Sequence, residues 1–273
     1  MSKKKVLIVT QEMQPYTELN EIAATVRSLA PYLQNNGMEI RVLMPRYGTI
    51  NERRHRLHEV VRLSGMNIIV DDDDYPLIIK VASLPNVRMQ VYFLDNDDFF
   101  KRKRVFTDAD GKAFEDNADR SVFFCKGVVE TVKKFGWAPD IVHVHGWMTG
   151  LIPFYLRTAY KTEPLFENSK IIYSLYESGV ENSLTDQFAT KASINALTES
   201  DLDGFFDENG KPDVHRGAMA YCDIIAKGQE EYSAPVQALL DATDKPTIDI
   251  RGEDSAAAFA DYYLSIISEE VEN

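Results

Sequence analysis

The chain has 273 residues, of which 44% are hydrophobic, enough for one large α/β domain with a buried core. Its formal net charge of −13 argues against nucleic-acid binding, which needs clustered Lys and Arg. The basic run at residues 101–104 is interpreted as a solvated turn. No apolar stretch is long enough to span a membrane, and Cys125 and Cys222 form neither a disulfide framework nor a zinc motif. We therefore expect a cytoplasmic protein that binds neither nucleic acid nor membrane.

Short apolar runs alternate with segments of helical periodicity along the chain. The runs predicted to be strands are residues 5–10, 40–45, 91–95, 140–145, 170–175 and 223–226. The segments predicted to be helices are residues 22–33, 116–135, 150–160, 215–221, 229–240 and 254–268. This alternation predicts an α/β fold class, a Rossmann-like, doubly wound, mostly parallel sheet with helices on both faces.

A small β-hairpin is predicted as an insertion in this fold. Residues 60–70 and 77–84 are strand-like, and residues 71–76 between them contain four successive aspartates. These aspartates lack the spacing of a calcium-binding loop, so a solvated turn is favoured over a metal site.

The chain lacks the motifs of several common catalytic sites. It has no glycine-rich dinucleotide fingerprint, P-loop, nucleophile elbow or zinc-binding helix motif. No catalytic residue, metal or cofactor is therefore predicted. Because open α/β sheets bind ligands at the carboxyl ends of their strands, we expect the site in the loops after residues 5–10, 140–145 and 170–175.

Four runs carry a resemblance to a known family: residues 5–16, the Pro-Arg-Tyr-Gly turn at 45–48, the Asp-Asn-Ala-Asp-Arg segment at 116–120, and residues 139–147. On these runs the chain resembles bacterial glycogen synthases and plant starch synthases, in consistent order from about residue 5 to 240. The resemblance implies a retaining GT-B glycosyltransferase of family five, which transfers glucose from ADP-glucose to an α-1,4-glucan in a cleft between two Rossmann-like domains.

Only the N-terminal half of such an enzyme is matched. Residues 1–245 are predicted to form the N-terminal domain, and residues 246–273 an extension whose helix packs back on it. The family's second domain, which carries most nucleotide contacts, would begin near residue 240, where few residues remain.

The loop before the first predicted helix departs from the family motif Lys-x-Gly-Gly-Leu. The resemblance implies that this lysine pairs with the donor diphosphate and that the glycines allow close approach of the backbone. Here Glu18 replaces the lysine, and Asn20 and Glu21 replace the glycines. Two like charges 4 Å apart repel by about 4 kcal/mol at an effective dielectric of 20. An ADP-sugar is therefore expected to bind poorly.

Two further loops depart from the family. The family's His-Asp-Trp aligns with residues 145–147, where Gly146 replaces the carboxylate, and its Ile-His-Asn aligns with residues 175–177. The candidate cleft residues are Glu12, Tyr16, Glu18, Asn20, Glu21, His145, Trp147, Tyr176 and Glu177.

Most of these candidates also have a structural interpretation. His145 and Trp147 could form a sugar platform or simply pack the loop, and His143 is expected to point away from His145. Glu12 and Tyr16 could hydrogen-bond a polar ligand, although Glu12 could instead cap the following helix.

Two other groups of residues are given structural roles or set aside. Asp116, Asn117 and Arg120 are expected to serve as helix cap and ion pairs rather than in catalysis. The carboxylates Glu177 and Glu181 could suggest glycoside hydrolysis, but nothing fixes their separation.

The preferred hypothesis is a degenerate, stand-alone N-terminal domain, inactive by itself, that binds an α-glucan, another sugar ligand or a protein partner. An alternative is half of a glucan-synthesising glycosyltransferase completed by a separate C-terminal domain. A third is an interaction protein, for example a homodimer, that uses the face normally covered by the second domain.

Overall fold

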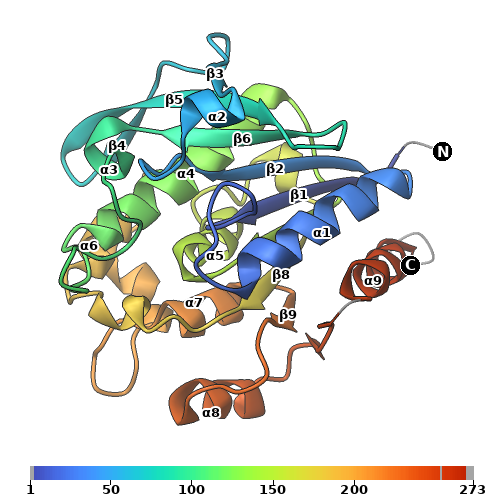
Figure 1. Cartoon of the computed structure of the whole chain (residues 1–273). Helices are drawn as coiled ribbons and strands as arrows, with labels where there is room; N and C mark the ends of the chain where they lie inside the picture. The colour runs from blue at the N-terminus through green and yellow to red at the C-terminus, as the bar shows by residue number, and fades with distance from the viewer. Residues whose placement is uncertain (1–2, 253, 269–273) are drawn as a thin grey trace.

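The computed structural model describes residues 3–252 and 254–268, and its centre is a mostly parallel sheet (Figure 1). The strands are β1 (Lys5–Thr10), β2 (Glu39–Pro45), β3 (His58–Glu59), β4 (Met66–Val70), β5 (Asp73–Ser83), β6 (Gln90–Asp95), β7 (Ile141–His145), β8 (Lys170–Leu175), β9 (Ile224–Lys227) and β10 (Thr247–Ile248). Their order is β10-β9-β8-β7-β1-β2-β6-β5-β3, and β4 pairs with β5. Pairs from β10 to β6 are parallel, whereas β5 is antiparallel to its neighbours.

Helices cover both faces of the sheet, which confirms the predicted fold class. They are α1 (Glu21–Asn35), α2 (Glu52–His55), α3 (Asp97–Phe100), α4 (Asn117–Phe135), α5 (Leu151–Arg157), α6 (Phe188–Ala192), α7 (Val214–Tyr221), α8 (Ala234–Ala242) and α9 (Ser255–Ser268). Helix α1 packs on β1, β2 and α9, and α5 packs between α4 and α7. Strands β1, β7 and β8 are buried along almost their whole length, as expected for apolar strands with helices on both sides.

Two predicted segments differ from the observed elements. In the hairpin, β5 already begins at Asp73, and Val70 pairs with Asp73, so the turn is only Asp71 and Asp72. Asp71 adopts a left-handed conformation with φ of 55°, which Asp tolerates better than most residues. The helix predicted at 229–240 begins five residues later, because Tyr232 holds the preceding loop by accepting from the backbone N–H of Gly228.

Helix α9 contacts the sheet through a buried polar group. The Tyr263 hydroxyl is hydrogen-bonded to Nδ1 of His143, whose Nε2 lies 2.7 Å from the Ser174 hydroxyl. The Phe259 ring lies 5.2 Å from the His143 ring. Within the predicted extension, β10 also continues the sheet beside β9, while residues 253 and 269–273 lie outside the described residues.

Candidate functional site

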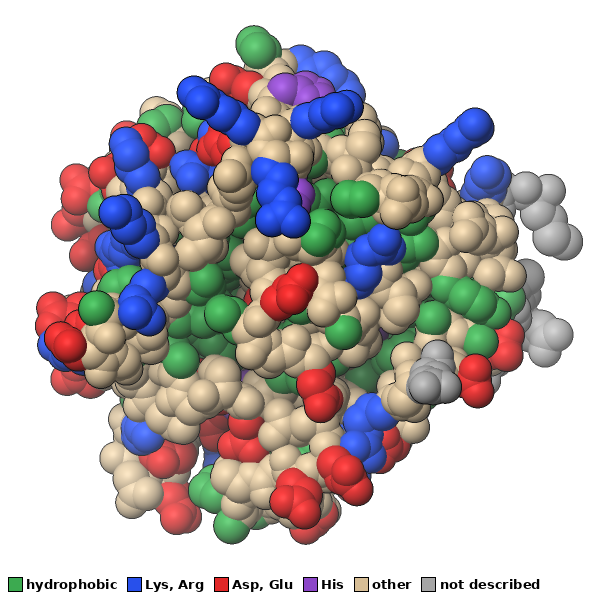
Figure 2. Space-filling model, in the orientation of Figure 1, with side chains coloured by type: hydrophobic (Ala, Val, Ile, Leu, Met, Phe, Trp, Pro, Cys, Tyr) green, Lys and Arg blue, Asp and Glu red, His purple; other side chains and the backbone are tan. Residues whose placement is uncertain are grey.

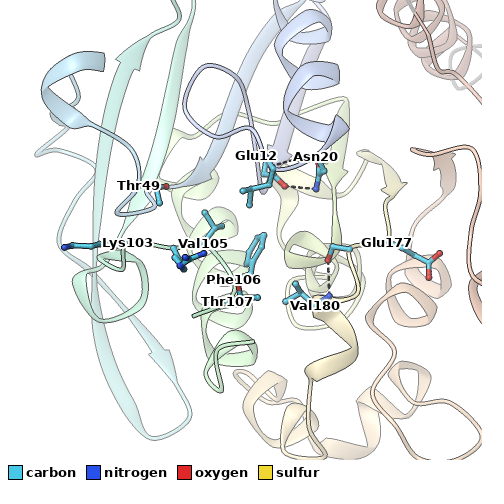
Figure 3. Close-up of a pocket in the computed structure, with 12 residues that line it drawn as sticks. Glu12, Asn20, Thr49, Lys103, Val105, Phe106, Thr107, Glu177 and Val180 are labelled. Atoms are coloured by element: carbon cyan, nitrogen blue, oxygen red, sulfur yellow. Dashed lines mark hydrogen bonds between the residues drawn. The ribbon is translucent and has the colours of Figure 1, made fainter. Parts of the chain in front are cut away.

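A pocket of about 530 Å³ opens where the loops after β1, β2, β6 and β8 meet (Figure 3). We call it the carboxyl-edge pocket. Its lining residues are Glu12, Leu19, Asn20, Thr49, Lys103, Arg104, Val105, Phe106, Thr107, Glu177, Ser178 and Val180. The site therefore lies at the predicted sheet edge, and it brings together three of the predicted residues, Glu12, Asn20 and Glu177.

Glu12 is fully buried and acts as an internal anion for the loop before α1. Its carboxylate accepts hydrogen bonds from the backbone N–H of Leu19 (2.7 Å) and of Asn20 (3.3 Å), and from Nδ2 of Asn20 (2.7 Å). Asn20 in turn caps α1 by accepting from the backbone N–H of Ile22 at 2.8 Å. Burial raises the pKa of Glu12, although the hydrogen bonds from Leu19, Gln11 and Asn20 oppose this shift. The amides that could face an external anion are thus already bound.

Two more carboxylates lie near the same helix end. Glu18 and Glu21 are both exposed, and Glu21 lies in the first turn of α1. Exposure means that solvent screens Glu18, so its repulsion of an anion is weaker than the sequence-based figure. The larger obstacle to an anion is the buried Glu12 carboxylate and not the exposed Glu18.

The side chain of Gln11 fills the space beside Gly146, the position at which the sequence analysis expects a family aspartate to be replaced. A Cβ atom built on Gly146 would lie 2.3 Å from Oε1 of Gln11, and the residue has φ of 87°. Oε1 of Gln11 also accepts a hydrogen bond from the backbone N–H of Met148 at 3.2 Å. The glutamine therefore joins the end of β1 to the segment that follows β7.

His145 and Trp147 are fully buried and do not line the carboxyl-edge pocket. The ring of Phe106, which does line it, covers Trp147 at a centroid distance of 5.1 Å. Burial lowers the pKa of His145 to about 3. Within the described residues, neither ring nitrogen of His145 nor Nε1 of Trp147 has a hydrogen-bond partner. Both side chains thus pack beneath the site.

The expectation that His143 and His145 point in opposite directions was wrong. Residues two apart on a strand lie on the same face, and the two imidazole rings are 3.9 Å apart. Both rings therefore lie on the face of the sheet where Phe259 of α9 packs.

Tyr16 and Tyr176 also lie outside the pocket. Tyr16 is buried against the rings of Phe93, at 4.9 Å, and His55, at 5.0 Å. Tyr176 is buried beside Gly228, where an added Cβ would lie 2.5 Å from the tyrosine ring. Their role in this structure is packing of the loops that follow β1 and β8.

The carboxylates of Glu177 and Glu181 have separate partners. Glu177 accepts from the backbone N–H and the hydroxyl of Ser233, at 2.7 and 2.6 Å, and its carboxylate points away from the pocket in Figure 3. Glu181 is buried and interacts with Ser178 and with Nε2 of His215, 3.2 Å away. Burial would raise the pKa of Glu181, but the hydrogen bonds of His215 and Ser178 lower it to about 2. Each carboxylate is therefore held by neighbouring groups.

Sequence reasoning missed the contribution of the loop after α3. Lys101 pairs with Asp97 at 2.9 Å and Arg102 with Asp116 at 2.5 Å, but Lys103 and Arg104 line the pocket. Phe106 projects into the pocket in Figure 3, while the Lys103 side chain extends away from its centre. Because this loop follows the parallel strand β6, the sequence could have predicted its place at the carboxyl edge of the sheet.

The Asp116–Arg120 region is partly as predicted. Asp116 makes the expected ion pair, but its side chain forms no cap for α4 because both carboxylate oxygens bind Arg102. The buried guanidinium of Arg120 donates to the carbonyl of Phe99 at 2.9 Å and to Oδ1 of Asn117 at 2.7 Å. Desolvation lowers the pKa of Arg120 to about 10. Nδ2 of Asn117 in turn donates to the carbonyl of Phe106 at 3.0 Å, which holds the loop that carries Phe106.

The chemistry available in the pocket is that of a polar binding site. Within the described ranges, no three His, Cys, Asp or Glu side chains are grouped so as to hold a metal ion. No helix of residues 3–252 and 254–268 has the length and apolar character needed to cross a bilayer. Hydroxyl groups, two cations and the Phe106 ring remain as contacts for a ligand.

Comparison with known proteins agrees with this fold. The sequence model of the starch synthase catalytic domain matches residues 5–240. Glycogen synthase of Pelodictyon phaeoclathratiforme is 39% identical over 236 residues, which cover 85% of this chain and 47% of that protein. Glycogen synthase of Chlorobium phaeobacteroides is 32% identical over 237 residues, with the same coverage.

A solved structure shows the same architecture. The catalytic domain of starch synthase IV from Arabidopsis thaliana, bound to ADP and acarbose, matches with a TM-score of 0.69 and 17% identity over 82% of this chain and 45% of that one. The chain thus spans about half the length of the curated relatives it matches. It belongs to the glycogen and starch synthase family, of which it matches the N-terminal half.

Proposed function

We propose that this chain is a glycogen and starch synthase-type domain that has lost the donor site and binds a glucan or a related cytoplasmic sugar in the carboxyl-edge pocket. The observation that carries the proposal is the loop before α1, where the side chain of Asn20 donates to the Glu12 carboxylate and this carboxylate also binds the amides of Leu19 and Asn20. A diphosphate at this end of α1 would have to displace a buried carboxylate. The starch synthase IV catalytic domain, which shares this fold, is bound to both ADP and acarbose. For this chain we expect binding of the oligosaccharide and not of the nucleotide.

The pocket suits a neutral sugar better than a nucleotide. Part of Phe106, a residue that is 6% exposed, reaches the pocket, and Thr49 and Thr107 supply hydroxyl groups around it. Sugar rings combine an apolar face with many hydroxyls, so an aromatic ring and a few polar groups are the contacts they need. The side chain of Gln11, lying where an aspartate would project from position 146, leaves the pocket without that carboxylate.

The experiment is isothermal titration calorimetry of the purified chain with maltoheptaose and, separately, with ADP-glucose. We expect heat with the glucan and none with the nucleotide. Phe106→Leu is expected to weaken glucan binding roughly tenfold, the effect of losing one aromatic contact. Phe114→Leu is the matched control. The guanidinium carbon of Arg120 lies 6.0 Å from the centre of the Phe106 ring and 5.4 Å from the centre of the Phe114 ring, but Phe114 lines a different pocket. Equal losses in both variants would refute the assignment of the glucan to this pocket.

A second candidate is half of a glucosyltransferase whose donor site is completed by a C-terminal domain on another chain. Lys103 and Arg104 favour it, because they line the pocket and could contact a diphosphate held mainly by that other domain. Its test is glucose transfer from ADP-glucose to maltoheptaose after mixing this chain with the separately purified C-terminal half of one of the glycogen synthases above. Transfer that is lost in Lys103→Gln/Arg104→Gln would support this second candidate over the first.

A further inference from the structure

A second pocket, of about 800 Å³, lies between the segment 54–58, which joins α2 to β3, and the turn 83–88, which joins β5 to β6. We call it the arginine pocket. Its lining residues are Arg54, His55, Arg56, His58, Ser83, Leu84, Pro85, Asn86, Val87 and Arg88. The lining contains three arginines and two histidines and no Asp or Glu, in a chain whose net charge is −13.

The three arginines are exposed, and within the described part of the chain none of them has an ion-pair partner. Some other guanidinium groups of this protein are paired with carboxylates, for example Arg157 with Asp223 at 2.7 Å and Arg102 with Asp116 at 2.5 Å. The neighbouring carboxylate of Glu52 is taken by Lys80, 2.7 Å away. Like charges gathered without counter-ions repel one another, so a bound anion would stabilise this surface.

The segments that carry these side chains are held in place by the rest of the fold. Arg27 of α1 donates to the carbonyl of Pro85 at 3.1 Å, and Gln34 donates to the carbonyl of Arg88 at 3.0 Å. On the other side, the His55 ring packs against Tyr16. Figure 2 shows Lys, Arg and His side chains gathered at the top of the molecule, over α2 and β3. Cations on fixed segments lose little conformational freedom when they bind a ligand.

We propose that the arginine pocket binds a small phosphate-bearing anion. Guanidinium groups match phosphate oxygens with paired hydrogen bonds, and several arginines facing one cavity suit a multiply charged group such as a diphosphate. No Phe, Tyr or Trp lines the pocket, so it offers no stacking surface for nucleic-acid bases. A long polyanion would also meet the net negative charge of the molecule beyond the pocket. The ligand is therefore a compact phosphorylated metabolite.

The test is calorimetric titration of the full chain with inorganic pyrophosphate at low ionic strength. Binding is expected to weaken roughly a hundredfold in Arg54→Gln/Arg88→Gln, about tenfold for each charged hydrogen-bonding group lost. Both arginines are exposed, so the variant should fold, and circular dichroism checks this. The matched control, Lys161→Gln/Lys211→Gln, removes the same charge from two exposed lysines outside the pocket and should bind as the parent does.

Several outcomes would overturn the proposal. One is the absence of pyrophosphate binding to the parent chain, and another is an equal loss of affinity in the lysine control. Loss of binding in Lys103→Gln/Arg104→Gln, with the arginine variant unaffected, would place the anion in the carboxyl-edge pocket instead. A single-stranded oligonucleotide that binds more tightly than pyrophosphate would point to a nucleic-acid surface. None of these outcomes depends on whether the carboxyl-edge pocket binds glucan.

Discussion

The carboxyl-edge pocket and the arginine pocket lie beside the same helix, α1, and differ in charge. At the N-terminus of α1, Glu12 binds the amides of Leu19 and Asn20, and Glu18 lies near them. Along the helix, the turn that it contacts through Arg27 and Gln34 borders a cavity with three arginines that have no ion-pair partner among the described residues. An α/β sheet usually binds anions at its carboxyl edge and at helix N-termini. Here that position is filled by carboxylates, which shows that the fold places a pocket but the side chains decide its ligand.

The largest effect is expected from placing a carboxylate at position 146. Gly146→Asp should lower the free energy of unfolding by about 3 kcal/mol or more, because a backbone with φ of 87° and ψ of 165° costs a non-glycine residue about 1–3 kcal/mol and Gln11 must move. Urea denaturation measures the loss. Gly179→Asp is the matched control, since φ is 83° there and no atom lies within 4 Å of the added Cβ. Equal losses in the two variants would contradict the account of Gln11 as the side chain that occupies the space beside Gly146.

Lowering the pH should reduce the free energy of unfolding through the buried carboxylate of Glu181, which lies next to the carboxyl-edge pocket. Its pKa of about 2 is below the ordinary value of 4.5, so its stabilisation is present above pH 4.5 and lost as the pH falls toward 2. Between about pH 5.5 and 2.5 the parent should lose roughly 2–3 kcal/mol more than Glu181→Gln. Urea denaturation at both pH values measures the difference, with the exposed-site variant Glu208→Gln as control. An identical pH dependence for Glu181→Gln and the parent would contradict the assigned hydrogen bonds.

Removing the internal anion tests the occupied end of α1 directly. Glu12→Ala should destabilise the chain by about 2 kcal/mol, because the donors of Leu19 and Asn20 lose their acceptor. Glu177→Ala, which removes a half-buried carboxylate bound to Ser233, should cost about 1 kcal/mol. Chemical denaturation compares the two variants. A smaller loss of stability in Glu12→Ala than in Glu177→Ala would mean that water can hydrogen-bond the amides of Leu19 and Asn20 in place of Glu12. The Glu12 carboxylate would then be little obstacle to the binding of an external anion.

The smallest effect concerns the exposed charge. Glu18→Lys should change the free energy of unfolding by less than about 0.5 kcal/mol, since its side chain is in solvent. It should also fail to create ADP-glucose binding by itself, because Glu12 still holds the amides. Calorimetry with ADP-glucose checks this point. A clear gain of nucleotide affinity from this single change would show that Glu18, and not Glu12, closes the donor site.

The fold was largely predictable from the sequence, but the site was predictable only in outline. The runs at 5–10 and 170–175 are short and apolar, a pattern typical of strands buried in a parallel sheet, and the structure has strands with these bounds. The burial of Trp147 beneath Phe106 depends on a long irregular loop, whose path no periodicity encodes. The arginine pocket joins two segments, 54–58 and 83–88, and only the pairing of β3 with β5 brings them together.

The central claim is that this family member has lost its donor site and kept a sugar pocket. Calorimetry of the unmodified chain with ADP-glucose and with maltoheptaose tests it most directly. The account predicts no binding of ADP-glucose and measurable binding of the glucan, lost in Phe106→Leu and retained in Phe114→Leu. Micromolar binding of ADP-glucose would contradict the account, because it would require a diphosphate to bind where the Glu12 carboxylate now holds the amides of the α1 loop.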